Sequence, residues 1–202
     1  KVPGAAGSPG EDAGAGWVVD VEGHGRGEGV VADVDLSRTV GWFTVMYPVW
    51  LDAGELRWSE VTSGAPVVGE VIKRVKEQLR AVPGQGVGFG LLRYANADTA
   101  GVLRECPSPE VGFNYLGRMS TGTGPGGDWS LLAGGVAGQD PATPLGHVVD
   151  VNAIAEDTTD GLRLSTNWTW ASRLIPNEAI HELAEVWTEA LTGIAEETDT
   201  PP

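Results

Sequence analysis

The sequence predicts a layered domain in which β-strands pack against helices, of the α/β or α+β class. Residues 161–170 alternate apolar and polar side chains, which is typical of a half-buried strand. Residues 67–80 repeat apolar side chains at helical spacing, and Pro176 precedes a second stretch with the same spacing. Hydrophobic residues make up 41% of the 202 positions, which is enough to form a buried core.

Further strands are expected where β-branched and aromatic residues cluster. One strand is predicted to begin at Trp17, and a buried strand is predicted over residues 38–51, ending near Pro48. Shorter strands are predicted at 91–94, 111–117 and 147–155.

The composition along the chain also predicts its organisation. Residues 1–16 are mostly Gly, Ala, Pro, Ser and acids, so they are expected to form a flexible linker. Residues 17–196 are expected to form one ordered unit, and residues 197–202 an acidic tail. The glycine run at 84–90 lacks the spacing of a dinucleotide-binding loop and favours close backbone packing instead.

Charge and cysteine content exclude several classes of function. The 13 Lys and Arg against 28 Asp and Glu give a formal net charge of −15, which disfavours binding to nucleic acid or to an anionic membrane surface. The single cysteine, Cys106, excludes an internal disulfide framework, and the three histidines are too scattered for a Cys/His zinc site, so no metal is expected. No apolar run reaches the roughly 20 residues of a membrane span, and we expect a cytoplasmic protein.

The first candidate site is the run Glu22-Gly-His24-Gly-Arg26 at the end of the first predicted strand. Glycines allow polar side chains to be directed into one cavity, where a half-buried glutamate can act as a general acid or base. A polar turn closed by an ion pair between Glu22 and Arg26 accounts for the same spacing.

The second candidate is Asn114-Tyr115. A tyrosine hydroxyl in a cavity can donate a proton or stabilise an enolate, although a strand tyrosine at the edge of the core fits the pattern as well. Three other residues are expected to be structural. Cys106 has no pair of basic neighbours, and His147 and His181 each stand alone in the sequence.

Taken in order, four runs resemble the epimerization domain of nonribosomal peptide synthetases. They are EGHGR (22–26), RTVGWFTVMYPV (38–49), PGQGVGFG (83–90) and FNYLG (113–117). The chain has Gly27 where the family usually has Glu and Phe89 where it usually has Tyr. The family's HHxxxDG motif is missing, so the chain is expected to be the C-terminal half of such a domain.

The resemblance implies a fold like that of chloramphenicol acetyltransferase, with a mixed β-sheet packed with helices in each of two lobes and the active site in a tunnel between them. The implied substrate is an aminoacyl or peptidyl thioester on the phosphopantetheine arm of a peptidyl carrier protein, and the implied reaction is L-to-D epimerization by removal and return of the α-proton. No cofactor is expected to bind directly.

By position in these motifs, Glu22 matches the catalytic glutamate and Tyr115 a tyrosine of the tunnel, while His24, Arg26 and Asn114 are expected to support them. The expected partners are the N-terminal half of the domain, without which the piece is expected to be inactive, and the carrier protein. Two alternatives remain open: half of a condensation-type acyltransferase, and a non-catalytic piece that docks a carrier protein.

Overall fold

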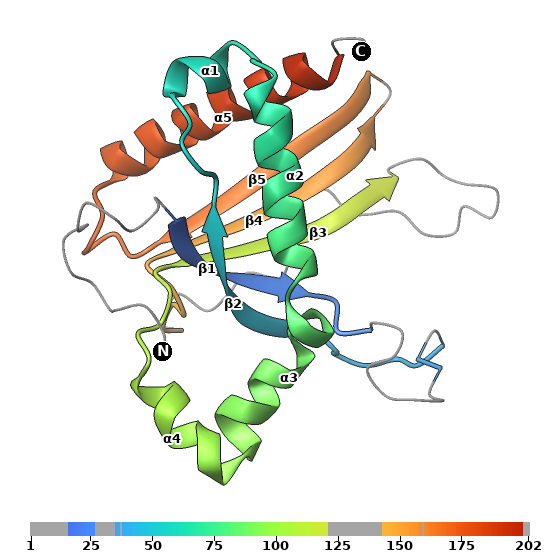
Figure 1. Ribbon diagram of the computed structural model, residues 1–202, viewed down its shortest axis with the longest axis vertical. Coiled ribbons are helices and arrows are strands. Elements are labelled where there is room, and N and C mark those ends of the chain that lie inside the picture. The colour runs from blue at the N-terminus through green and yellow to red at the C-terminus, as the bar shows by residue number, and fades with distance from the viewer. Residues whose placement is uncertain (1–15, 27–34, 37, 121–142, 159, 200–202) are drawn as a thin grey trace.

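The structure is a computed structural model that describes residues 16–26, 35–36, 38–120, 143–158 and 160–199 (Figure 1). Its elements, in chain order, are β1 (Gly16–Gly23), β2 (Val45–Asp52), α1 (Trp58–Thr62), α2 (Val67–Arg80), a 3₁₀ turn (Pro83–Gly86), α3 (Val87–Gly90), a π turn (Leu91–Ala95), α4 (Ala97–Glu105), β3 (Val111–Ser120), β4 (Val149–Thr158), β5 (Gly161–Trp170) and α5 (Asn177–Asp199).

The strands form one mixed sheet in the order β2-β1-β3-β4-β5. The outer pairs β1–β2 and β4–β5 are antiparallel, whereas β3 lies parallel to both of its neighbours, β1 and β4. The strand predicted to begin at Trp17 and the strands predicted at 111–117, 147–155 and 161–170 are confirmed, with shifts of a few residues at their ends.

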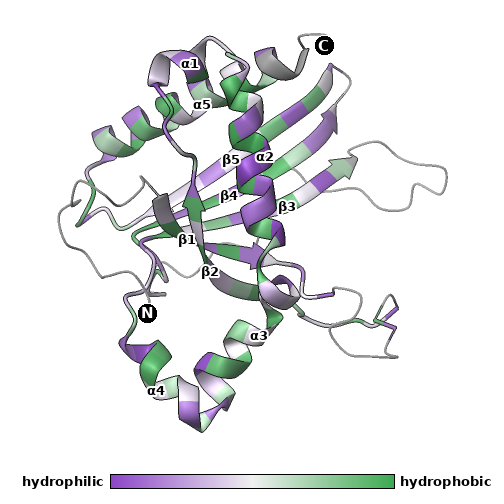
Figure 2. Ribbon diagram, viewed as in Figure 1, coloured by the Kyte–Doolittle hydropathy of each residue, from purple (hydrophilic) through white to green (hydrophobic). Residues whose placement is uncertain are grey.

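The core lies between the sheet and the helices, because α2 and α5 lie across the same face (Figure 1). Val149 and Val151 of β4 pack with Ile180 of α5. The Trp187 ring of α5 lies 6.1 Å from the Phe113 ring and meets Trp168 edge to face at 5.7 Å. Figure 2 shows hydrophilic residues along the side of α2 that is turned away from the sheet.

The predicted strand at 38–51 is wrong at both ends. β2 begins at Val45, and Val40 and Trp42 before it are exposed. The strand then continues through Pro48 to Asp52. Proline is tolerated there because, among the described strands, β2 lies at the edge of the sheet and pairs with β1 alone.

The predicted strand at 91–94 is also wrong, because residues 83–95 form a series of helical turns. A four-residue apolar run does not by itself distinguish a strand from a helix. Close packing is confirmed only at Gly86, which has a φ of 79° and where a Cβ would overlap the Tyr47 ring. A Cβ at Gly84, Gly88 or Gly90 would meet nothing within 4 Å.

The predicted unit boundaries differ slightly from the structure. β1 already includes Gly16, and α5 extends to Asp199 through part of the predicted acidic tail. The rest of the predicted linker and tail, at 1–15 and 200–202, lies outside the described residues. None of the helices described is both long and apolar enough to cross a bilayer.

Candidate functional site

The face of the sheet opposite α2 and α5 carries polar side chains on its three central strands. We call it the open face and define it by Asp20, Glu22, Asn114, Asp150 and Asn152. The register places Asp20 beside Gly112 and Gly112 beside Asp150, which forms one row across the sheet. Glu22, Asn114 and Asn152 lie two residues further along their strands, on the same face, because side chains alternate along a strand.

Glu22 lies near the end of β1, opposite Met46 of the edge strand, and its side chain is partly buried. Burial raises the pKa of its carboxyl, the negative charge of Asp150 raises it further, and the charge of His147 lowers it. The net shift is upward, which brings the carboxyl closer to the pH range in which a general base works efficiently.

His147 acts on the Glu22 carboxyl through its charge and has two close side-chain partners, contrary to the expectation that it stands alone. Its Nε2 lies 3.0 Å from Asp20 Oδ2 of β1, and its Nδ1 lies 2.7 Å from Asp150 Oδ1 of β4. Burial lowers the pKa of His147, but the hydrogen bonds to Asp20 and Asp150 outweigh burial and leave it raised. The ring therefore bridges two strands that are separated in the sheet by β3.

Asn114 and Asn152 form the neighbouring polar contact. The amide nitrogen of Asn114 donates to the Asn152 side-chain oxygen at 3.1 Å. This bond fixes the orientation of the Asn114 amide on the open face. Asn114 therefore lies in the same row of the open face as Glu22, as the supporting role predicted for it requires.

Arg26 does not pair with Glu22, so the polar turn closed by an ion pair is wrong among the described residues. Its guanidinium donates to the carbonyl oxygens of Leu36 at 2.7 Å and Gly41 at 3.3 Å and lies 4.3 Å from the centre of the Phe43 ring. Arg26 thus ties the end of β1 to the segment before β2.

His24 is exposed just after β1. The backbone N–H of Arg26 donates to its Nδ1 at 3.0 Å, so in the neutral ring the hydrogen is on Nε2. The described contacts do not place His24 against Glu22.

Tyr115 follows Asn114 in β3 and therefore lies on the opposite face of the sheet from Glu22. Its side chain is 51% exposed and its strand partner is Ala153. The structure does not bring Tyr115 and Glu22 together, and the role predicted for Tyr115 stays a prediction.

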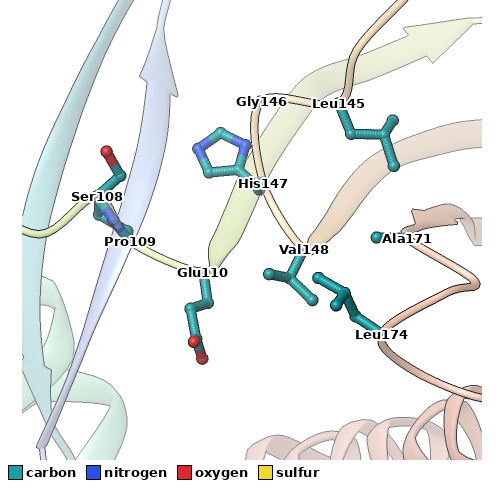
Figure 3. Close-up of a pocket in the computed structure, with 9 residues that line it drawn as sticks. All are labelled: Ser108, Pro109, Glu110, Leu145, Gly146, His147, Val148, Ala171 and Leu174. Carbon is teal, nitrogen blue, oxygen red and sulfur yellow. The ribbon is translucent and has the colours of Figure 1, made fainter. Parts of the chain in front are cut away.

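A shallow pocket of about 310 Å³ opens at the ends where β3 and β4 begin (Figure 3). Figure 3 shows the Val148 and Leu174 side chains turned toward each other, whereas the His147 ring points away from them. The pocket is lined by none of the five residues predicted for the site. Among Asp20, His147 and Asp150, which contact one another on the open face, only His147 lines the pocket.

The sequence reasoning missed Asp20, His147 and Asp150. The available signals were the two-residue spacing of Asp20 and Glu22 and that of Asp150 and Asn152, which predict polar side chains on one face of each strand. Within the part of the chain that the structure describes, no group of three or more His, Cys, Asp or Glu residues is arranged to hold a metal ion.

Comparison with known proteins agrees with this architecture. The chain is 37% identical over 182 residues to a component of the linear gramicidin synthase of Brevibacillus parabrevis, a match that covers 87% of this chain and 3% of that protein. It is 37% identical over 172 residues to chondramide synthase cmdD of Chondromyces crocatus, a match that covers 85% of this chain and 4% of that protein. The chain therefore spans a small fraction of the length of these synthases.

Among solved structures, the chain resembles the epimerization domain from the third module of tyrocidine synthetase B, with a TM-score of 0.67 and 32% identity. The match covers 90% of this chain and 37% of that one. The predicted fold, like that of chloramphenicol acetyltransferase, is confirmed by this likeness and by the mixed five-stranded sheet. Residues 13–201 match the family model described as "Condensation domain", and the chain belongs to the condensation-domain family of nonribosomal peptide synthetases.

Proposed function

We propose that this chain supplies the Glu22 half of an epimerization site. The substrate is an aminoacyl or peptidyl thioester on the phosphopantetheine arm of a carrier protein. The observation that carries the proposal is the Glu22 carboxyl itself. It lies partly buried on the open face with a raised pKa, and it shares its row with Asn114 and Asn152, which are hydrogen-bonded to each other.

The chemistry follows from what such a carboxyl can do. Ionised Glu22 takes the α-proton, the Cα–H bond breaks, and its electron pair moves into the thioester carbonyl to give an enolate. Return of a proton to the opposite face of the planar intermediate inverts the centre, and return to the same face restores it. No atom is gained or lost, and no oxidant is required.

Inversion requires acid/base groups on two sides of the intermediate. The open face supplies one side, and we propose that a second lobe, which covers this face, supplies the other. Two observations support this. Apolar Val18, Met46 and Trp50 on the same face are exposed. The similar epimerization-domain structure also extends well beyond the part that matches this chain.

The test uses a synthetase that contains this chain and a loaded carrier domain, incubated in D₂O. Wild-type protein is expected to introduce deuterium at the α-carbon and to give a mixture of L and D residues, measured by mass spectrometry and chiral chromatography after release. Glu22→Gln keeps the size of the side chain but removes the base, so exchange is expected to fall about 100-fold or more. Glu55→Gln changes an exposed carboxyl after β2 and serves as the matched control.

The pH dependence adds a second readout. Glu22 must be ionised to accept the proton, and its pKa is raised, so the exchange rate is expected to increase with pH over a range above the ordinary pKa of glutamate. Undiminished exchange in Glu22→Gln protein would overturn the assignment of the base.

The match to the condensation family model favours one second candidate, an acyltransferase that forms an amide bond. The same sample separates the two functions when an acceptor aminoacyl carrier is added. Amide formation without α-proton exchange supports condensation. Exchange without an acceptor supports epimerization, and the absence of both reactions supports a docking piece.

A further inference from the structure

The buried imidazole of His147 is a titratable group that the proposed reaction does not use. Its side chain is only 5% exposed, and each ring nitrogen faces a carboxylate oxygen, from Asp20 and Asp150. A neutral imidazole donates through one nitrogen only, whereas an imidazolium donates through both. The geometry therefore fits the charged ring, which satisfies both carboxylates at once.

The ring reaches both carboxylates because β3 has no side chain between them. Gly112 is the register partner of Asp20 on one side and of Asp150 on the other. A Cβ built on Gly112 would lie 2.5 Å from His147 Nδ1 and 2.8 Å from its Cε1, and it would also overlap the Asp150 carboxylate. The glycine thus leaves the space that the imidazole occupies.

This cluster is connected to Glu22 through the backbone of β1. Asp20 and Glu22 are two residues apart, so their side chains leave the same face of the strand. Because His147 contacts Asp20 on one side and Asp150 on the other, it links the part of β1 that carries Glu22 to β4 across β3.

We propose that His147 is the positioning residue of the Glu22 site, which clamps β1 to β4 across Gly112 and supplies a fixed positive charge beside the base. The proposal rests on the proposed function of Glu22 as a base.

The charges around the cluster agree with this role. Asp20, Glu22 and Asp150 are the carboxyls that interact with His147 from β1 and β4, and Glu110 lies before β3 in the lining of the same pocket. Burial and the charge of Asp150 both raise the pKa of Glu22, and His147 opposes them by lowering it. His147 thus favours the ionised form of Glu22, which proton abstraction requires.

The test is an NMR titration of the full 202-residue chain, in which the Glu22 carboxyl carbon and the His147 ring nitrogens are followed against pH. In wild-type protein, both ring nitrogens of His147 are expected to be protonated at pH 7. His147→Gln removes the charge, so Glu22 is expected to titrate at higher pH than in the wild type. Asp150→Asn removes the carboxylate that opposes ionisation, so Glu22 is expected to titrate at lower pH.

His181→Gln is the matched control, because it makes the same change at an exposed histidine on α5. It is expected to leave the titration of Glu22 unchanged. A neutral His147 ring in wild-type protein at pH 7 overturns the proposal, and so does a folded His147→Gln protein in which Glu22 titrates as in the wild type. If His147→Gln does not fold, the wild-type titration serves instead: a Glu22 carboxyl signal that does not respond when the His147 ring loses its proton overturns the proposal.

The titration and the exchange assay separate the two proposals. If the titrations shift as expected but the loaded wild-type synthetase exchanges no α-proton, the positioning role of His147 is supported and the proposed epimerization function is refuted. If the wild type exchanges and neither variant moves the titration of Glu22, the function stands and the role of His147 fails.

Discussion

Gly112→Ala tests the packing on which the open face depends. Gly112 lies at the centre of the sheet with the His147 ring directly over it, and an added Cβ would lie 2.5 Å from His147 Nδ1. Both the ring and the Asp150 carboxylate would have to move. The 2.7 Å contact between His147 and Asp150 is therefore expected to break.

The size of the effect follows from two costs and one gain. A hydrogen bond to a charged group contributes about 1.5–3 kcal/mol, and an extra methyl in a packed site costs about 1–3 kcal/mol. Replacement of a strand glycine by alanine returns about 0.5–1 kcal/mol of backbone entropy. The free energy of unfolding is therefore expected to fall by about 2–5 kcal/mol, a large fraction of the roughly 5–15 kcal/mol of a typical domain.

Urea denaturation followed by circular dichroism measures this change. Gly146→Ala is the matched control, because Gly146 precedes His147 and a Cβ there would meet nothing within 4 Å. Its effect is expected to stay within about 0.5 kcal/mol. If Gly112→Ala protein were as stable as Gly146→Ala protein, the close packing of His147 on Gly112 would be refuted.

Two further predictions concern stability. Gly86→Ala is expected to lower the free energy of unfolding by at least about 3 kcal/mol in urea denaturation, because a Cβ would overlap the Tyr47 ring at a left-handed backbone position. Gly84→Ala, with a left-handed φ of 54° but open space around the Cβ, is expected to cost only about 1–2 kcal/mol. Equal losses would contradict the packing of Gly86 on Tyr47. Burial lowers the pKa of His147, but the bonds to Asp20 and Asp150 raise it on balance, so the folded chain holds this proton more tightly than the unfolded chain. The stability that this proton contributes is complete below the unfolded pKa of about 6.5 and is lost as pH rises through the folded pKa. Unfolding measured over a pH series is expected to show this loss in the wild type but not in His147→Gln protein.

The sequence predicted those parts of the fold whose pattern is local. α2 covers Val67–Arg80 as its apolar spacing indicates, and β5 covers Gly161–Trp170 as its alternation indicates. The prediction failed at 91–94, where a short apolar run carries no periodicity, and at Pro48, whose place in β2 depends on which strand forms the edge of the sheet. Strand order is a property of the whole chain and is not encoded in one segment.

In the candidate site, too, the local pattern could be predicted and the long-range contacts could not. Glu22, His24 and Arg26 lie in one short motif and were predicted together, although the partners of Arg26 turned out to be Leu36, Gly41 and Phe43. His147 was missed because its partner Asp20 is 127 residues away in the sequence. Only the register of three strands brings the two side chains together, and a lone histidine before a strand gives no signal of that register.

The two rows of the open face have different chemical roles, and the difference follows from Gly112. In the first row the missing side chain admits the His147 ring, which contacts one oxygen of each of two carboxylates and links β1 to β4. In the second row β3 carries Asn114 instead of glycine, its amide bonds to Asn152, and no described hydrogen bond engages the Glu22 carboxyl. A base held by its strand but unpaired at its oxygens can accept a proton without first breaking a bond. The first row thus fixes the position of β1, and the second row leaves the Glu22 carboxyl without a described hydrogen bond, as its proposed role as a base requires.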